Sequence, residues 1–209
     1  IWSTRLKRRY ECPVVNLGFS GSGKMEHVMF DALAEIDARA YIIDCVPNCA
    51  ALTCQEFEER LRYGIDRLRK AGKAPIIFAE NQFIDHPSAL VHSAGYRGQM
   101  EKDSVQQQVV KELQAKGVEG LYYVTRADPG FEADDFIEGD HLNDIGMLKY
   151  ERAYARVLNQ AMVGADTMRH YTPCTQRRDG YDWIERHNSI IRRNHETDPE
   201  VLMIGNSIT

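Results

Sequence analysis

Apolar residues in the first 160 positions fall into short unbroken runs separated by longer stretches with helical spacing. The short runs predict buried strands; they are Pro13–Leu17, Ala40–Cys45, Ala74–Ala79 and Leu121–Thr125. Between them, apolar positions that recur every three or four residues predict helices; these cover Met25–Ile36, Cys54–Lys70, Gly98–Lys116 and Ile145–Val163. Strands that alternate with helices in this way predict an α/β fold, with a parallel sheet covered on both faces.

This alternation breaks in the last quarter of the chain. Gly164–Asp179 is polar and shows no period, so we expect a linker there. Gly180–His195 then predicts a helix, and Glu200–Ile204 predicts one more apolar strand. That strand runs into the turn Gly205-Asn206-Ser207, and a strand followed by a tight turn is how many hydrolases present a nucleophilic serine.

Composition and charge exclude several classes of protein. The 209 residues are 43% hydrophobic and 27% charged, as is typical of a globular domain. The net charge is −5, and the longest basic run, Arg5–Arg9, is too short to indicate a nucleic-acid surface. No apolar run approaches the roughly 18 residues that a membrane helix needs. No signal-peptide pattern is visible. We therefore expect neither a nucleic-acid partner nor a membrane partner.

The cysteines do not predict a disulfide framework or a metal site. Five cysteines are too few and too irregularly spaced for a framework of disulfides. Cys45, Cys49 and Cys54 lie close together, but they lack the paired two-residue spacing of zinc ligands and no histidine is near. We predict that they are small buried hydrophobic residues, and that the protein needs no metal and no cofactor.

Gly18–Lys24 has the spacing of a phosphate-binding loop and lies between a predicted strand and a predicted helix. Asp44, at the end of the next strand, could serve as the acidic residue of a nucleotide site. The position after Lys24, however, is Met25, and a thioether is a poor ligand for magnesium. Nucleotide binding through this loop remains an alternative hypothesis.

The same segments also contain the parts of an acyl-transfer site, which needs a nucleophile, a base, an orienting acid and donors for the oxyanion. Gly18 directly follows a strand and offers a backbone N–H, and Asn48 follows the next strand and offers a side-chain amide. His141 precedes a predicted helix, and Glu138 lies three residues before it. On one tight turn a carboxylate at that spacing can orient the imidazole. In a parallel sheet all these positions belong to the carboxyl edge.

Three segments carry a family resemblance: Asn16–Glu26, Ile43–Asn48 and Glu138–Gly146. In this order they resemble three successive blocks of the SGNH (GDSL-like) hydrolases, over roughly residues 5–160. The resemblance implies a flavodoxin-like three-layer α/β/α sandwich, oxyanion donors at Gly18 and Asn48, and a general base at His141. The family places Asp where this chain has Glu138, with Asp140 as a fallback orienting acid. The first family block, which carries the serine, has no counterpart before residue 5.

Tyr181–Asn188 and Asp198–Thr209 resemble the opening of another SGNH hydrolase, similar to platelet-activating-factor acetylhydrolases. The interpretation that we favour is a fragment of a tandem protein. Residues 1–163 then form a hydrolase-like domain without its first strand, 164–179 a linker, and 180–209 the start of a second domain. In the alternative, a circular permutation, Ser207 serves Gly18, Asn48 and His141 of the same chain. Ser20, and next to it Ser22, are fallback nucleophiles in the glycine turn.

The missing strand has a physical consequence. In this fold the first strand is central, and its loss leaves unpaired backbone on the strands at both sides, which is costly when buried. We predict that Glu200–Ile204 fills this place, within one chain or by exchange between two, and so brings Ser207 toward His141.

Together these patterns predict a serine esterase for small acyl esters. The family resemblance implies that the acyl group is acetyl and that the alcohol is a carbohydrate. Its partner is then a small-molecule or carbohydrate ester, and the family suggests a periplasmic or secreted bacterial protein. A phosphate-loop nucleotide binder and an inactive carbohydrate-binding relic of an esterase are the alternatives. The isolated fragment need not be active.

Overall fold

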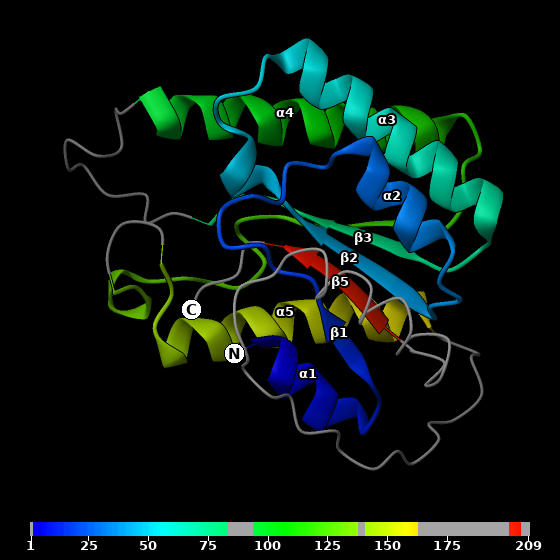
Figure 1. Cartoon of the computed structure of the whole chain (residues 1–209). Coiled ribbons are helices and arrows are strands. Elements are labelled where there is room, and N and C mark those ends of the chain that lie inside the picture. Colours follow the sequence, from blue (N-terminus) through cyan, green and yellow to red (C-terminus); the bar gives the residue numbers. More distant parts are fainter. Residues whose placement is uncertain (1, 83–93, 138–140, 163–200, 206–209) are drawn as a thin grey trace, which may run out of the picture.

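A computed structural model describes residues 2–82, 94–137 and 141–162 and the backbone of 201–205. Its elements follow one another in the order α1 (Trp2–Tyr10), β1 (Val14–Asn16), α2 (His27–Ala34), β2 (Ala40–Asp44), η1 (Val46–Cys49), α3 (Cys54–Ala71), β3 (Ile76–Ala79), α4 (Ala94–Ala115), β4 (Leu121–Val124), η3 (Ala133–Asp135), α5 (Asp144–Ala161) and β5 (Val201–Gly205). Figure 1 shows them arranged around one twisted sheet. The predicted linker 164–179 and helix 180–195 lie outside the described residues.

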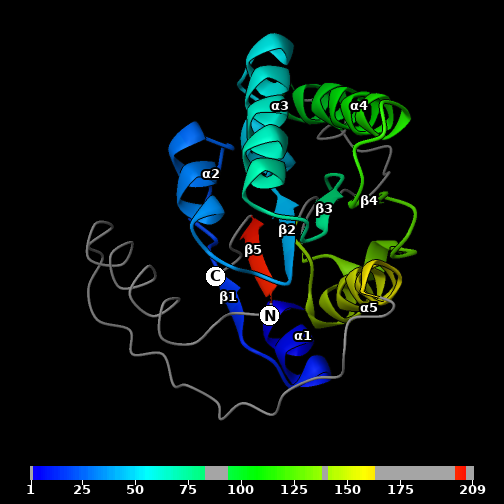
Figure 2. The ribbon, with the colours of Figure 1, turned by 90° about the vertical axis from the view of Figure 1, so that its right-hand side faces the viewer.

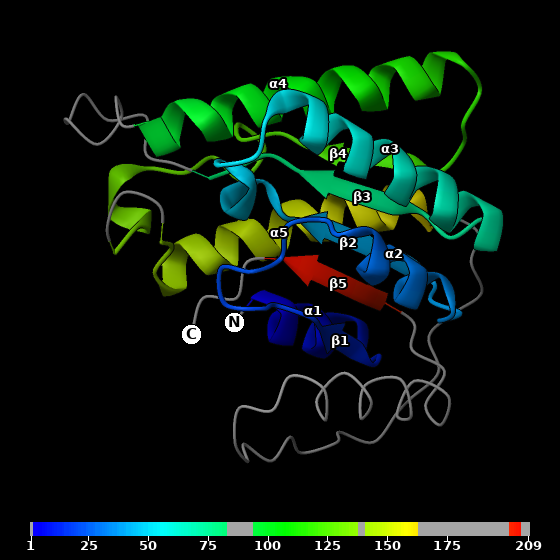
Figure 3. The same ribbon diagram turned by 45° about the horizontal axis from the view of Figure 1, so that its top comes forward.

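The sheet has five strands in the order β1-β5-β2-β3-β4, and every pairing is parallel. β5 comes last in the chain, yet it lies between β1 and β2. Val201 pairs with Val14 on one side and with Ala40 on the other. In Figure 3, β5 is the red arrow that runs alongside β2. The prediction that this strand fills the vacant central place beside Pro13–Leu17 is confirmed.

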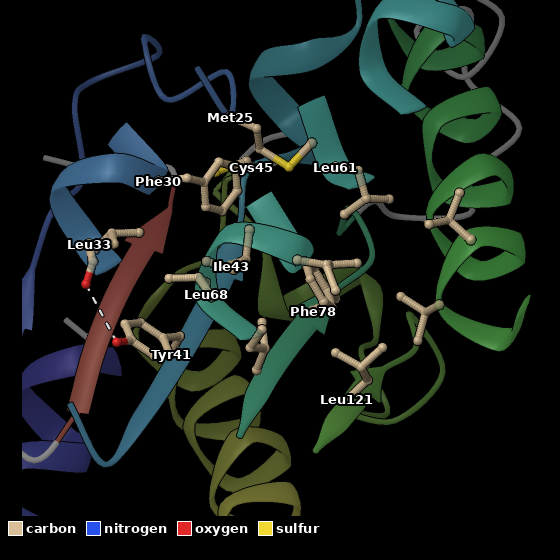
Figure 4. Packing of buried hydrophobic residues seen from close by; sticks show 14 of the residues in the cluster. Met25, Phe30, Leu33, Tyr41, Ile43, Cys45, Leu61, Leu68, Phe78 and Leu121 are labelled. Carbon is tan, nitrogen blue, oxygen red and sulfur yellow. Dashed lines mark hydrogen bonds between the residues drawn. The ribbon is translucent and has the colours of Figure 1, made fainter. Parts of the chain in front are cut away.

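Helices cover both faces of the sheet, as the alternating pattern predicted. α2, α3 and α4 lie on one face, and α1 and α5 lie on the other (Figure 2). The alternation of side chains along β2 divides the core accordingly: Tyr41 and Ile43 pack with α2 and α3, whereas Ala40 and Ile42 pack with α1 and α5. Figure 4 shows the first of these clusters, in which Phe30 of α2 approaches Met25 and Cys45. The three-layer α/β/α sandwich is therefore present.

Local sequence explains where α3 and α5 begin. Thr53 caps α3: its hydroxyl accepts the Glu56 N–H, and the Glu56 carboxylate accepts the Thr53 N–H, which forms a capping box. The Asn143 side chain caps α5 by accepting the N–H groups of Ile145 and Gly146. Both helices begin within a residue or so of the predicted start.

The structure departs from the sequence predictions at three places. The segment with the basic run Arg5–Arg9 forms helix α1, whose buried face carries Trp2, Leu6 and Tyr10. α4 begins at Ala94 rather than Gly98. Val28, one of the apolar residues whose spacing predicted the helix Met25–Ile36, is 60% exposed. In the first case the helical spacing of the apolar residues was present, but four cationic residues between them obscured it.

Among the described helices, none combines the length and the apolar character that crossing a bilayer requires.

The contact between α2 and α3 offers a test of the packing. A Cβ added at Gly64 of α3 would lie 2.3 Å from the Phe30 ring, which is 1% exposed and cannot easily move. We expect Gly64→Ala to lower the free energy of unfolding by about 1–3 kcal/mol, as overpacking of a core does. Gly72→Ala is the matched control, because a Cβ there meets nothing within 4 Å.

Both variants are measured by urea unfolding. Phe30→Leu, added to Gly64→Ala, should recover part of the loss because it shortens the side chain that the new methyl group meets. Equal stability of the Gly64→Ala and Gly72→Ala variants would contradict the packing described here.

Candidate functional site

The carboxyl edge of the sheet gathers three of the segments that the sequence singled out. Because all strands are parallel, the loop after β1, the turn η1 after β2 and the end of β5 emerge at the same edge. In Figure 3 this edge is on the left, together with the start of α5. The order of the strands sets the order of these parts, so that β5 ends between the loop with Gly18 and the turn with Asn48.

A hydrogen bond joins the first two segments directly. The Asn48 side-chain amide donates to the Gly23 carbonyl oxygen at 3.2 Å, and the Arg60 guanidinium of α3 donates to the Lys24 carbonyl oxygen at 2.9 Å. A primary amide has two N–H groups, so this bond uses one of them. Asn48 is half-buried. The loop after β1 is thus held against the Asn48 turn.

Gly18, the other predicted oxyanion donor, is buried two residues after the end of β1. Its N–H donates to the Asn16 side-chain oxygen at 2.9 Å. An oxyanion would have to take the place of Asn16 Oδ1 before Gly18 could act as a donor.

His141 lies on a short, closely bonded loop before α5. The Ile137 N–H donates to the His141 carbonyl oxygen at 2.7 Å, and Phe136 and Leu142 form an antiparallel bridge. The Asn143 N–H donates to the Asp135 carbonyl oxygen at 2.9 Å. These bonds fix the main chain on both sides of a half-buried histidine. α5 itself reaches the carboxyl edge, because its Tyr150 hydroxyl donates to the Asp44 carboxylate at the end of β2.

Three of the remaining predicted site residues have no described position, whereas the two fallback serines lie in the glycine turn. Ser207, Glu138 and Asp140 lie outside the described residues. Ser20 is exposed in a tight turn with φ of 49°, and Ser22 follows it, with its N–H bonded to the Phe19 carbonyl oxygen at 3.2 Å. The structure therefore brings Gly18, Asn48 and the loop of His141 to one edge.

The geometry of the glycine loop does not fit a phosphate-binding loop. Such a loop leads straight into a helix, whose first N–H groups bind the phosphates. Here α2 begins only at His27, and the Lys24 N–H donates to the Glu26 carboxylate at 3.0 Å. A carboxylate at that place would repel phosphate. Met25, at the position of the magnesium ligand, is 2% exposed in the apolar core. The nucleotide-binding alternative is therefore wrong for this loop.

The cysteines differ from one another more than the sequence indicated. Cys45 and Cys49 are buried, as predicted, and burial raises the pKa of the Cys49 thiol to about 12. Cys54 is exposed at the start of α3, so the prediction of a buried residue was wrong there. Among the described residues no group of three or more His, Cys, Asp or Glu side chains is arranged to hold a metal ion.

Asp44 is a buried carboxyl group at the end of β2. Its Oδ2 accepts the Tyr150 hydroxyl at 3.1 Å, and the Tyr154 hydroxyl donates to Tyr150 at 2.6 Å. Within the described part of the chain, Oδ1 has no hydrogen-bond partner. Burial raises the pKa of Asp44 to about 7, although the bonds from the two tyrosines act in the opposite direction.

A second buried polar group borders the same edge and was not predicted. It consists of Asn81 after β3 and of Gln99, Asp103 and Gln106 on α4, all at most 9% exposed. The sequence predicted a helix over Gly98–Lys116, but its period did not show that polar residues on it would be buried. A possible signal was the position of Asn81 just beyond a buried strand, at the edge where functional residues gather.

Comparison with known proteins identifies a family to which most of the chain corresponds. The family model described as the GDSL-like lipase/acylhydrolase family matches residues 1–159. No curated protein matches the chain.

Two solved structures are similar. One, described as a GDSL-like lipase from Bacteroides ovatus, has a TM-score of 0.66 and 26% identity, over 78% of this chain and 47% of that one. The other, the salicylyl-acyltransferase SsfX3 from a tetracycline biosynthetic pathway, has a TM-score of 0.61 and 14% identity, over 80% of this chain and 50% of that one. The second likeness shows a shared fold alone. The chain spans about half the length of both.

The burial of the Asp44 carboxyl group predicts how the stability of the fold depends on pH. Its pKa is raised from 3.8 to about 7 in the folded state, so the folded protein holds this proton more tightly than the unfolded chain does. The contribution to stability is therefore complete below about pH 4 and is lost as the pH rises to about 7. Its full size is at most about 4 kcal/mol.

We expect Asp44→Asn to flatten the fall in the free energy of unfolding between about pH 4 and pH 8, measured by urea unfolding. Burial also raises the pKa of Asp103 to about 7. Asp103 therefore causes a similar fall in the free energy of unfolding with rising pH, and this part of the fall remains in the Asp44→Asn variant. A variant with the same pH dependence as the wild type would show that Asp44 is not desolvated.

Proposed function

Because this chain belongs to the GDSL-like lipase/acylhydrolase family, we propose that it supplies the active site of a serine esterase for small acyl esters. The observation that carries the proposal is the place of β5 between β1 and β2. The main chain leaves the sheet at Gly205, between the loop with Gly18 and the turn with Asn48. Ser207 follows two residues later in the sequence.

In the proposed mechanism Ser207 attacks the ester carbonyl carbon while His141 takes its proton, and Glu138 orients the imidazole. The tetrahedral oxyanion accepts hydrogen bonds from the Gly18 N–H and from the second N–H of the Asn48 amide. His141 returns the proton to the leaving alcohol, and water then hydrolyses the acyl-enzyme by the same sequence of steps. The oxyanion replaces Asn16 Oδ1 as the acceptor of the Gly18 N–H.

For the substrate we propose an acetyl ester, with carbohydrate as the alcohol. The family resemblance supports this choice, and the half-length match to the solved relatives leaves room for further chain that contributes to recognition. We also propose that 164–179 links the main domain to the segment 180–209, whose strand β5 completes the sheet. In a tandem parent protein the same place would be filled by the parent's own first strand.

Removal of the oxyanion donor tests the site. We expect Asn48→Ala to lower kcat for 4-nitrophenyl acetate by about 100-fold or more, because the lost bond acts on the transition state. Asn159→Ala is the matched control: it removes an exposed amide that accepts a bond from Tyr10, on α5 and away from the turn. It should change kcat by less than about twofold.

Substitution of the nucleophile separates the candidate serines. Ser207→Ala should abolish turnover and labelling by an organophosphate, whereas Ser20→Ala should leave both intact. Loss of labelling in Ser20→Ala but not in Ser207→Ala would transfer the role to the glycine turn. A wild-type chain that binds acetylated sugar without hydrolysing any ester would identify the inactive relic instead.

A further inference from the structure

A line of buried hydrogen bonds connects α4 and β3 to the Asn48 turn. The Gln99 amide donates to the Pro47 carbonyl oxygen at 3.0 Å, and its own oxygen accepts the Asn81 amide at 2.9 Å. The Asn81 main-chain N–H donates in turn to the Asp103 carboxylate at 2.8 Å. Asn81 is 1% exposed, and Asp103 is 4% exposed. These groups have exchanged water for one another, so a lost partner leaves an unsatisfied buried group.

The Pro47 carbonyl belongs to the peptide bond that leads into Asn48. A bond to this oxygen therefore fixes the orientation of the Asn48 main chain. On the other side of the turn, the Asn48 N–H donates to the Cys45 carbonyl oxygen at 3.0 Å, and the Asn48 side chain reaches Gly23. Gln99 supplies the bond to this turn from α4, while the other two come from the turn itself and from the loop after β1.

The backbone of α4 also lies directly against the turn. A Cβ added at Gly98 would lie 2.5 Å from the Ala50 carbonyl oxygen, which is closer than any real contact. The absence of a side chain at Gly98 therefore allows the helix to approach, and that approach brings the next residue, Gln99, within reach of Pro47. The two neighbouring residues act together on the same turn.

We propose that Gln99 is a positioning residue, which holds Asn48 where its amide can stabilise the oxyanion. This inference rests on the proposed function, since it assigns Asn48 the role of donor. Misplacement of a catalytic group by about 1 Å can lower a rate by as much as 100-fold. A buried glutamine that binds a main-chain carbonyl adjacent to the donor is suited to prevent such a displacement.

The chain offers a matched control on the same helix. Gln106 is 0% exposed and donates to the Ala79 carbonyl oxygen of β3 at 2.9 Å. It makes the same kind of bond as Gln99, from a buried amide to a main-chain carbonyl, but not to the turn. Gln99→Met and Gln106→Met each remove a bond to a main-chain carbonyl and one further side-chain bond, with Asn81 in the first case and with the Tyr123 hydroxyl in the second. The two variants change the side-chain volume similarly and differ in whether the Asn48 turn loses its support.

For Gln99→Met we expect kcat for 4-nitrophenyl acetate to fall by about 10-fold or more with KM little changed. For Gln106→Met we expect a similar loss of thermal stability with kcat within about twofold. In an Asn48→Ala background, Gln99→Met should have less than about a twofold further effect, because a residue that acts through Asn48 has nothing left to position. Gly98→Ala should lower kcat in the same way as Gln99→Met.

Amide hydrogen exchange gives a readout that does not need turnover. Gln99→Met should speed exchange in the segment 45–52 by about fivefold or more, while Gln106→Met leaves it unchanged. Unchanged exchange there in Gln99→Met, equal losses of kcat in the two glutamine variants, or additive losses with Asn48→Ala would each overturn the inference. If Asn48→Ala has no effect on the rate but exchange responds as expected, the proposed donor role fails and the anchoring of the turn stands.

Discussion

The pairing of β5 with both β1 and β2 is the constraint on which the rest of this structure depends. A parallel sheet with helices on both faces has no water at its centre to satisfy an unpaired strand. β1 and β2 both have hydrogen-bonding edges toward the same gap, and β5 satisfies them with five residues in register with β2. Without it, β1 would have no hydrogen-bonded neighbour in the described sheet.

The same pairing determines what the carboxyl edge can do. Because β5 is central, the chain leaves the sheet at Gly205 between two loops that already touch through Asn48 and Gly23. The edge has polar groups on both sides of this point, Asp44 with its tyrosines on α5 and the Asn81–Gln99 pair beside α4. Buried polar groups lower stability unless they are bonded, so their concentration at one edge suggests that they serve the site.

The hydrogen bonds of Gln99 and Asn81 and the close approach of Gly98 hold the turn that carries Asn48. A turn of four residues such as η1 has few internal bonds of its own. Its orientation must then come from its neighbours, and here these are the loop after β1 on one side and α4 on the other. The proposed oxyanion donor is thus held by elements that are far from it in the sequence.

The sequence by itself determined the elements and their alternation, because strand and helix periods are local properties. The apolar faces of α3 and α5 followed from residue order, and the vacancy beside Pro13–Leu17 followed from the family resemblance of the sequence segments. Only the tertiary structure decided the surroundings of each face. The polar side of α4 is buried, Cys54 is exposed, and the Lys24 amide binds Glu26 rather than facing a free anion site. A period shows which residues share a face, but what that face meets depends on contacts between distant segments.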